Sequence, residues 1–553
     1  MKLFDRPVVT CIFLHLFAFT HLAVSQTSEP QLLAPDPSID TFGAGENYTT
    51  TSDTRNDIYI RILDGGTLIN GTEYKLYNNN TLDIESGGNL RNDGLLQNAG
   101  TIDNQGEMGI QQGTLNNAVD GTINNHGFLT NIGTLNNDGT LNNYGSSEDI
   151  DRSGLYVGVG KVLNNKGLVN NDSKLVVNYG VFNNIIRSTL TNNTDATLDI
   201  RGIMTNQGLV TNDGLLKTGT GDTVFNHRGG VLNNNASITN YGSLENYQAT
   251  INNASGSTTY NKGLLSNTAG GTINNASGST IDNEGTMSNR GFSGYLEDGT
   301  YVERESLFTN NGTINNSYLL QNQRLGIFQN NGTINSTVSQ SGAISSIQNQ
   351  GTLVNNGTIN GNVDVKAGGI LTGSGTIAGS VLLEGTINPG NSPGTITTSN
   401  QTWINGASYG WEINDSNGTA GGAVGWDLID ITATEIENGS LDLSQLTTGG
   451  FGIDVISLDA LNDLGLAEGF DDPNGEYEFV ILTAIGGITG FEADDFTIND
   501  DGFNNSDSLS WSINQDGNNL VLKATGYTLV PEPSSSSILG VSVFIMLLRR
   551  KRS

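Results

Sequence analysis

The chain has 553 residues with 24 Lys and Arg against 56 Asp and Glu, and its formal net charge of −32 excludes a nucleic-acid partner, which would need a concentrated basic surface. Its 74 Gly and 9 Pro, with 35% hydrophobic residues, fit neither collagen nor Pro-rich disorder. One Cys and four His leave almost nothing for a Cys- or His-based metal site or a Ser-His-Asp triad, so we expect no metal, no cofactor and no catalytic residue.

The first 25 residues have the three regions of a secretory signal peptide. A basic start and an apolar stretch at residues 8–23 precede the small residues Ala23-Val24-Ser25. We expect cleavage between Ser25 and Gln26, and the alternative is an uncleaved membrane anchor. Residues 26–59 would then form an N-terminal cap or linker.

A repeat of about six residues dominates the chain from residue 60 to 395. Glycines recur mainly every six residues from Gly88 to Gly145, and the unit approximates Gly-Thr-(Leu/Ile)-Asn-Asn. Self-similarity of this kind is typical of a solenoid. A helix is disfavoured, because Gly and Asn in every unit would weaken each turn. A β-solenoid instead needs a short strand with an inward aliphatic residue, followed by a corner where Gly and Asn tolerate positive φ.

The sequence therefore predicts an all-β fold, with a parallel β-helix over residues 60–395. Coils of roughly 20 residues would stack about 4.8 Å apart as about 16 coils, with Asn side chains forming hydrogen-bonded ladders. No Pro occurs between Ser38 and Asn388, as expected when nearly every N–H donates to a neighbouring coil. The alternatives are a disordered Asn-rich tract and a left-handed hexapeptide helix. The aliphatic residue in nearly every unit disfavours the first, and the irregular intervals favour a right-handed coil over the second.

The junction at residues 368–396 resembles the β-helix repeats of bacterial autotransporter passengers and related adhesins. The specific part is the Pro-Gly-Asn-Ser-Pro-Gly turn at residues 389–394. No alternating-hydrophobic membrane barrel follows it, so we do not expect export by a fused translocator.

Residues 396–529 are expected to form an acidic, β-rich cap domain. No Lys or Arg occurs between Lys366 and Lys523, and short alternating strands lead to a hairpin at residues 511–522. Such a cap would close the open end of the solenoid and shield its edge from other chains.

This C-terminal region also carries candidate binding residues. We expect its tryptophans in the core, because a small β domain needs large side chains, and the alternative is a carbohydrate-binding module in which they stack on sugar rings. Acidic clusters at residues 471–476 and 500–502 could bind calcium, but the EF-hand spacing is absent and we expect solvated turns. The four tryptophans are Trp403, Trp411, Trp426 and Trp511.

Two charge-dense insertions interrupt the repeats, at residues 148–152 and 297–305. We expect both to be solvated loops. The alternative is that they hold the carboxylate pair of a polysaccharide-cleaving enzyme.

The last 24 residues carry the motif Pro531-Glu532-Pro533, an uncharged run at 538–548, and a basic cluster of Arg549, Arg550, Lys551 and Arg552. The uncharged run is shorter than the roughly 20 residues that span a bilayer, so we expect only transient membrane contact. Residues 530–553 resemble the PEP-CTERM sorting signal. That resemblance implies export across the inner membrane of a Gram-negative-type bacterium and processing by exosortase, with Pro531, Glu532 and Pro533 as its recognition residues. The alternative is an ordinary tail anchor.

Together these features predict a non-enzymatic, exported, adhesin-like β-solenoid of the outer envelope, the cell surface or the extracellular matrix. Exosortase would be its processing partner, and exopolysaccharide or other surface proteins would be its further partners. The alternatives are a lectin-like matrix protein that binds carbohydrate and a β-helix polysaccharide lyase or hydrolase.

Overall fold

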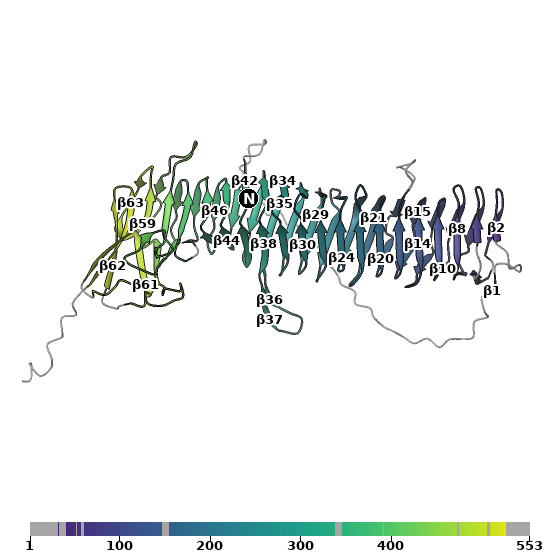
Figure 1. Cartoon of the computed structure of the whole chain (residues 1–553), viewed down its shortest axis with the longest axis horizontal. Helices are drawn as coiled ribbons and strands as arrows, with labels where there is room; N and C mark the ends of the chain where they lie inside the picture. The colour runs from purple at the N-terminus through teal and green to yellow at the C-terminus, as the bar shows by residue number, and fades with distance from the viewer. Residues whose placement is uncertain are drawn as a thin grey trace, which may run out of the picture.

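The computed structural model describes residues 31–32, 40–50, 52–56, 60–145, 154–337, 346–390, 392–472, 475–505 and 509–526. The expected signal peptide with its Ser25–Gln26 cleavage site, the Pro-Glu-Pro motif and the basic tail lie outside these residues. The described chain is an elongated rod of β-strands, with a single 3-10 turn at Ala493–Asp495 among the described residues (Figure 1). The predicted all-β, parallel solenoid is confirmed. Its right-handed sense stays a prediction.

Each coil contributes one short strand to each of three faces. In one coil, β5 (Ile60–Ile62) lies on face 1, β6 (Thr67–Asn70) on face 2 and β7 (Lys75–Asn78) on face 3. Every strand pairs in parallel with the equivalent strand of the next coil; for example, β7 pairs with β10 (Leu95–Asn98). A coil of about 20 residues thus holds three units of about six residues, which explains the glycine spacing.

Face 1 stacks sixteen described strands between residues 60 and 389, in agreement with the predicted count of about 16 coils. They are β5, β8 (Thr81–Ile84), β11 (Thr101–Asn104), β14 (Thr122–Asn125), β17 (Thr140–Asn143), β20 (Leu168–Asn171), β22 (Thr189–Asn192), β24 (Leu209–Asn212), β27 (Val231–Asn234), β30 (Thr250–Asn253), β33 (Thr272–Asn275), β38 (Ser306–Asn310), β41 (Gly326–Asn330), β44 (Thr352–Asn355), β47 (Ile370–Gly373) and β50 (Thr386–Pro389).

Faces 2 and 3 stack in the same way, and two long strands, β21 (Lys174–Asn184) and β23 (Thr197–Asn206), run across the corner between them. Face 2 further contains β9 (Asn89–Asn92), β12 (Glu107–Ile110), β15 (Phe128–Asn131), β18 (Gly154–Val157), β25 (Leu215–Thr218), β28 (Ser237–Asn240), β31 (Thr258–Asn261), β34 (Thr280–Asn283), β39 (Thr313–Asn316), β42 (Thr333–Ser336), β45 (Thr358–Asn360) and β48 (Thr376–Ile377). Face 3 contains β13 (Thr114–Asn117), β16 (Thr134–Asn137), β19 (Val162–Asn165), β26 (Thr223–His227), β29 (Ser243–Tyr247), β32 (Leu264–Thr268), β35 (Thr286–Arg290), β40 (Leu319–Asn322), β43 (Ser346–Asn349), β46 (Val363–Val365) and β49 (Val381–Leu383).

The interior of the repeat region is built, in most strands, from the second and fourth residue. In β13, Leu115 and Asn117 are buried, whereas Thr114 and Asn116 face outward. The inward aliphatic residue is confirmed. The expectation that Asn turns the chain at the corner is wrong for the last Asn of the unit. Because side chains alternate along a strand, this Asn lies two residues after the aliphatic one and points into the same core.

The buried Asn side chains form the predicted ladders. On face 1 the ladder is unbroken from Asn104 to Asn355, with each Nδ2 donating to the next Oδ1 at 2.6 to 2.8 Å. Face 3 has a longer ladder of the same kind, from Asn56 to Asn349, with bonds of 2.7 to 2.9 Å. The second amide hydrogen reaches a backbone carbonyl, as in the 3.0 Å bond from Asn234 to Thr258. Within the ladders, the amide of each Asn that has a ladder neighbour on both sides is therefore satisfied without water, whereas Oδ1 of Asn104, at the start of the face 1 ladder, is buried without a partner among the described residues.

The repeat glycines are needed for close approach between coils, not for positive φ as expected. A Cβ on Gly100 would lie 2.0 Å from the carbonyl oxygen of Asn80, and one on Gly127 would lie 2.1 Å from that of Gly106. No glycine in the described segment 88–139 has positive φ.

Parallel stacking continues beyond residue 395. On face 1, β50 is followed by β53 (Ser408–Ile413), β58 (Phe451–Ser457) and β61 (Phe496–Gly502). On face 2, β59 (Glu476–Ala484) pairs antiparallel with β63 (Asn519–Gly526), which pairs antiparallel with β62 (Leu509–Asp516). The predicted terminal hairpin is confirmed, and it covers the last strand of face 2 (Figure 1).

Aromatic side chains fill the interior of these last coils. Trp403 and Trp411 are fully buried, and Trp403 stacks on Phe451 with ring centroids 4.1 Å apart. Trp426 and Trp511 are partly buried and pack against Phe479. The tryptophans are core residues, as expected, so a sugar has no access to Trp403 or Trp411.

Candidate functional site

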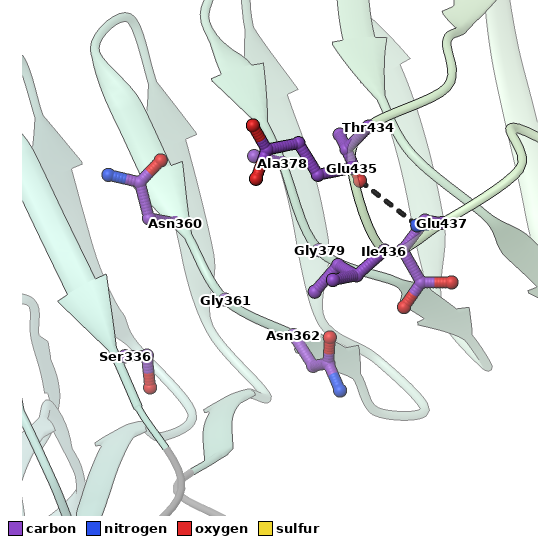
Figure 2. A pocket seen from close by; sticks show the side chains of 10 residues that line it. All are labelled: Ser336, Asn360, Gly361, Asn362, Ala378, Gly379, Thr434, Glu435, Ile436 and Glu437. Atoms are coloured by element: carbon purple, nitrogen blue, oxygen red, sulfur yellow. Dashed lines mark hydrogen bonds between the residues drawn. The ribbon is translucent and has the colours of Figure 1, made fainter.

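A cleft of about 580 Å³ lies on the edge between faces 2 and 3, near the C-terminal end of the repeats. Its floor is made by glycine corners, where a Cβ on Gly379 would lie 2.3 Å from the backbone of Gly361. Bare corners of this kind leave a depression beside the segment Thr434–Glu437, which comes from a later coil. Figure 2 shows Ser336 and Asn360 on one side of the cleft and Thr434–Glu437 on the other.

The wall formed by Thr434–Glu437 is held by hydrogen bonds from the neighbouring coils. The Thr434 hydroxyl accepts a hydrogen bond from the Glu437 backbone N–H at 3.1 Å (Figure 2). The Glu437 carboxylate accepts hydrogen bonds from the Ser380 hydroxyl and from the Asn400 amide. Ile436, at the tip, is 87% exposed. The cleft thus combines carboxylates, amides and one exposed aliphatic side chain.

A second cleft, of about 330 Å³, lies where a hairpin leaves the rod. The hairpin consists of β36 (Phe292–Tyr295) and β37 (Tyr301–Arg304) and projects sideways from the stack (Figure 1). Arg290 and Arg324 line the cleft, and Arg324 lies 3.8 Å from Glu303 of the hairpin, with both side chains exposed. Solvent screens such a pair strongly, so it fixes the hairpin only weakly.

This hairpin is the second of the two charge-dense insertions. Its tip at residues 296–301 is exposed, which confirms the expected solvated loop. The first insertion, at 148–152, lies outside the described residues.

The acidic clusters of the C-terminal region are on the surface. Asp471, Asp472, Asp500 and Asp501 are all exposed. Among the described residues, no group of three or more His, Cys, Asp or Glu side chains is placed to hold a metal ion. Nor does the described part of the chain contain a helix with the length and apolarity needed to cross a membrane.

Asp427 is a buried carboxylate that no sequence motif singles out. Its two oxygens accept hydrogen bonds from the backbone N–H of Gly394 at 2.7 Å and of Glu412 at 3.1 Å. Burial raises the pKa of Asp427 well above its usual value, the nearby Glu412 carboxylate adds to this, and the two N–H donors oppose it. The side chain joins the turn at 389–394 to β53, and its place in the core indicates a structural role.

Local sequence could not reveal the first cleft. Residues 360–362 and 434–437 are more than 70 positions apart and meet only because later coils stack on earlier ones. The exposed Ile436 beside two Glu residues is the only local signal, and it resembles many solvated turns.

No protein-family model matches the chain, and no curated protein matches it. Among solved structures, the chain is similar to a "TibC-catalyzed hyper-glycosylated TibA55-350 fragment", with 14% sequence identity and a TM-score of 0.17. The match covers 62% of this chain and 88% of the fragment.

Proposed function

We propose that this protein is a non-enzymatic, exported surface or matrix protein whose adhesin-like rod holds contact surfaces away from the cell envelope. The observation that carries the proposal is the uninterrupted parallel stack with its two continuous Asn ladders. About 20 stacked strands on face 1, at about 4.8 Å each, give a rod roughly 90 Å long. Such a rod provides reach, and weak contacts repeated along it add up to firm attachment.

Sorting to the outside rests on the two ends of the chain. The signal-peptide pattern ending at Ser25 directs export, and the PEP-CTERM-like tail with Pro531-Glu532-Pro533 supports processing by exosortase. The tail then contacts the membrane only transiently, and the rod reaches the outer envelope, the cell surface or an exopolysaccharide matrix.

The location of the protein tests this proposal. An epitope-tagged full chain is compared with a variant lacking residues 530–553 and with a full-length variant in which Pro531, Glu532 and Pro533 are all Ala. We expect the full chain outside the inner membrane in processed form and both variants unprocessed. Normal processing of both variants would contradict the role of exosortase, and a full chain that stays in the cytoplasm would contradict export.

A second candidate function, binding of neutral polysaccharide, is favoured by the cleft beside Thr434–Glu437. Its carboxylates and amides can accept and donate hydrogen bonds to sugar hydroxyls, and Ile436 offers an apolar contact. The partly buried carboxylate of Glu437 makes an anionic polysaccharide a poor ligand, because like charges repel.

Binding to immobilised neutral polysaccharides tests this second candidate. The double variant Glu435→Gln with Ile436→Ala should weaken binding, because it removes groups that line the cleft. Leu461→Ala is the matched control, since Leu461 is 82% exposed but lies outside the cleft. Equal binding by all three proteins would rule this cleft out.

A further inference from the structure

Face 1 presents a long strip of strands without any charged outward side chain. The strip comprises the thirteen strands from β14 to β50, all of them described by the structure. In each strand, the side chains that point away from the core belong to Thr, Asn, Gln, Leu, Val or Ile. Partly exposed aliphatic residues recur along it, at Leu168, Leu209, Val231, Leu307, Ile327, Val354 and Ile370.

The other two faces do not share this property over the same coils. On face 2, charged side chains point outward, including Lys174, Lys217 and Asp282. On face 3, Glu245 and Arg290 do so. In a chain with a net charge of −32, a neutral strip of this length is a strong departure from the surrounding surface.

Charge also limits what can cover the strip. Two copies with this net charge repel each other over most of their surfaces, so close contact is favourable only where no carboxylate must be desolvated. The strip meets that condition. Charged residues such as Asp138, Lys166, Asp213 and Arg228 lie at the corners that flank it, which gives a neutral centre and a polar rim, as in protein–protein interfaces.

The size of the strip suits a stable dimer. Thirteen strands about 4.8 Å apart and about four residues wide, at roughly 3.3 Å per residue, cover about 750 Å². Two copies would bury roughly 1,500 Å², within the range of about 1,200 to 2,000 Å² for specific interfaces.

The composition of the strip also favours a second sheet over a sugar as its partner. No aromatic side chain points outward from these strands, so sugar rings have nothing to stack on. Flat faces of Thr, Val, Leu and Asn pack well against other sheets.

We propose that face 1, from β14 to β50, is the interface through which two copies of this chain pack side by side. The two sheets would lie about 10 Å apart, with their outward Thr, Asn and aliphatic side chains interdigitated. A pair of rods made in this way leaves faces 2 and 3, with their charges and the cleft on the edge between them, open to other partners. This proposal goes beyond the spacer role and does not depend on where the protein is sorted.

Sedimentation of the exported full chain over a range of concentrations and salt tests the proposal. We expect a reversible dimer whose dimer fraction rises with added salt, because salt screens the repulsion between two acidic rods. A chain that stays monomeric at all concentrations and salt levels would overturn it.

Two identical strands that follow each other in the chain provide matched variants. Both β16 and β17 read Thr-Leu-Asn-Asn, and Asn136 on face 3 and Asn142 on face 1 each sit in an outward amide ladder with a neighbour on both sides. Asn142→Glu places a carboxylate in the strip, whereas Asn136→Glu makes the same change outside it. We expect Asn142→Glu to weaken dimerisation by about tenfold or more, and Asn136→Glu to leave it unchanged.

Asn252→Glu in β30 repeats the test near the middle of the strip. Circular dichroism of each variant shows whether the solenoid is retained. Asn136→Glu makes the same change at an equivalent ladder position, so a loss of dimer in a folded face 1 variant alone points to the interface. Equal weakening by the face 1 and face 3 variants would overturn the assignment of the interface, as would normal dimerisation of Asn142→Glu and Asn252→Glu.

Discussion

The coils at residues 60–389 and those at 395–526 share one parallel stack but fill it differently. The first set uses one aliphatic residue and one Asn per strand, and its interior is nearly the same in every coil. The second set uses Trp403, Trp411 and Phe451, longer strands and the buried carboxylate of Asp427. The first interior is periodic and the second is specific to each coil.

This difference changes how each region resists a substitution. In a stack of similar coils, stability is roughly a sum of contributions from each coil and its neighbours, so damage stays local. In the C-terminal coils, a few large side chains contact many others, and the antiparallel hairpin β62–β63 closes the stack. Removal of one aromatic residue should therefore disturb several coils at once.

The largest effect is expected from Trp403→Ala. Truncating a fully buried aromatic side chain costs about 3–5 kcal/mol, because contacts are lost and a cavity remains. Hydrogen exchange should show loss of protection across the C-terminal coils, while coils near Asn104 stay protected. The partly buried Trp426, changed to Phe, is the control and should cost less. Loss of protection confined to β52 (Gln401–Trp403) would contradict the contrast between the regions.

Asn234→Ala should have the next largest effect. It removes the acceptor for the amide of Asn212 and the donor to Asn253 and Thr258, and each buried group left without a partner costs about 1–3 kcal/mol. Hydrogen exchange should show lost protection only in the adjacent coils. Asn233→Ala is the control in the same strand, because Asn233 points outward. If Asn234→Ala and Asn233→Ala reduce stability equally, the buried Asn ladder contributes little to the stability of the coil.

Gly127→Ala should destabilise its coil by about 1–3 kcal/mol, since the new methyl group would press on the Gly106 carbonyl of the coil below. Chemical denaturation followed by circular dichroism measures the change. Gly109→Ala is the matched control, because there a Cβ meets only the movable end of the Gln111 side chain. If both variants are equally stable, close approach is not what selects glycine.

The smallest net effect at neutral pH is expected from Asp427→Asn. Burial raises the pKa of Asp427 in the folded chain above the unfolded value of about 3.9, so the folded state binds the proton more tightly. Its contribution to stability is complete below that value and is lost as the pH rises through the folded pKa. The variant loses one backbone hydrogen bond but no longer buries a charge. Thermal unfolding of the C-terminal coils over a pH series should therefore show a weaker decline above about pH 4 in the variant than in the parent. If the stability of the variant and of the parent changes with pH in the same way, the carboxylate of Asp427 does not contribute to the pH dependence.

Much of the repeat region could be predicted because its rules are local. The six-residue period, the inward Leu or Ile and the lack of Pro predict the strands, the coil length and the number of coils. The burial of the last Asn follows from alternation along Thr-Leu-Asn-Asn and could have been predicted too. The reason why glycine recurs in each unit could not be predicted, because it depends on how closely the backbone of one corner approaches the corner of the coil below.

The C-terminal region and the clefts were less predictable for a related reason. The core position of the tryptophans followed from their size and spacing. The burial of Asp427 and the placement of Asn362 and Glu437 in one cleft depend on contacts between distant coils, which no local pattern contains. The neutral strip of face 1 can be recognised only after the strands are assigned to faces, because each coil contributes one strand in three to face 1.

The backbone hydrogen bonds of the stack run along the rod, and β2 (Asp40–Phe42) and β63 lie at its two ends (Figure 1). Tension applied between the ends therefore pulls each coil directly away from the next. The rod should yield one coil at a time, and each opened coil of about 20 residues would release roughly 65 to 70 Å of extended chain. In the proposed spacer role, such stepwise lengthening would let the rod extend under shear.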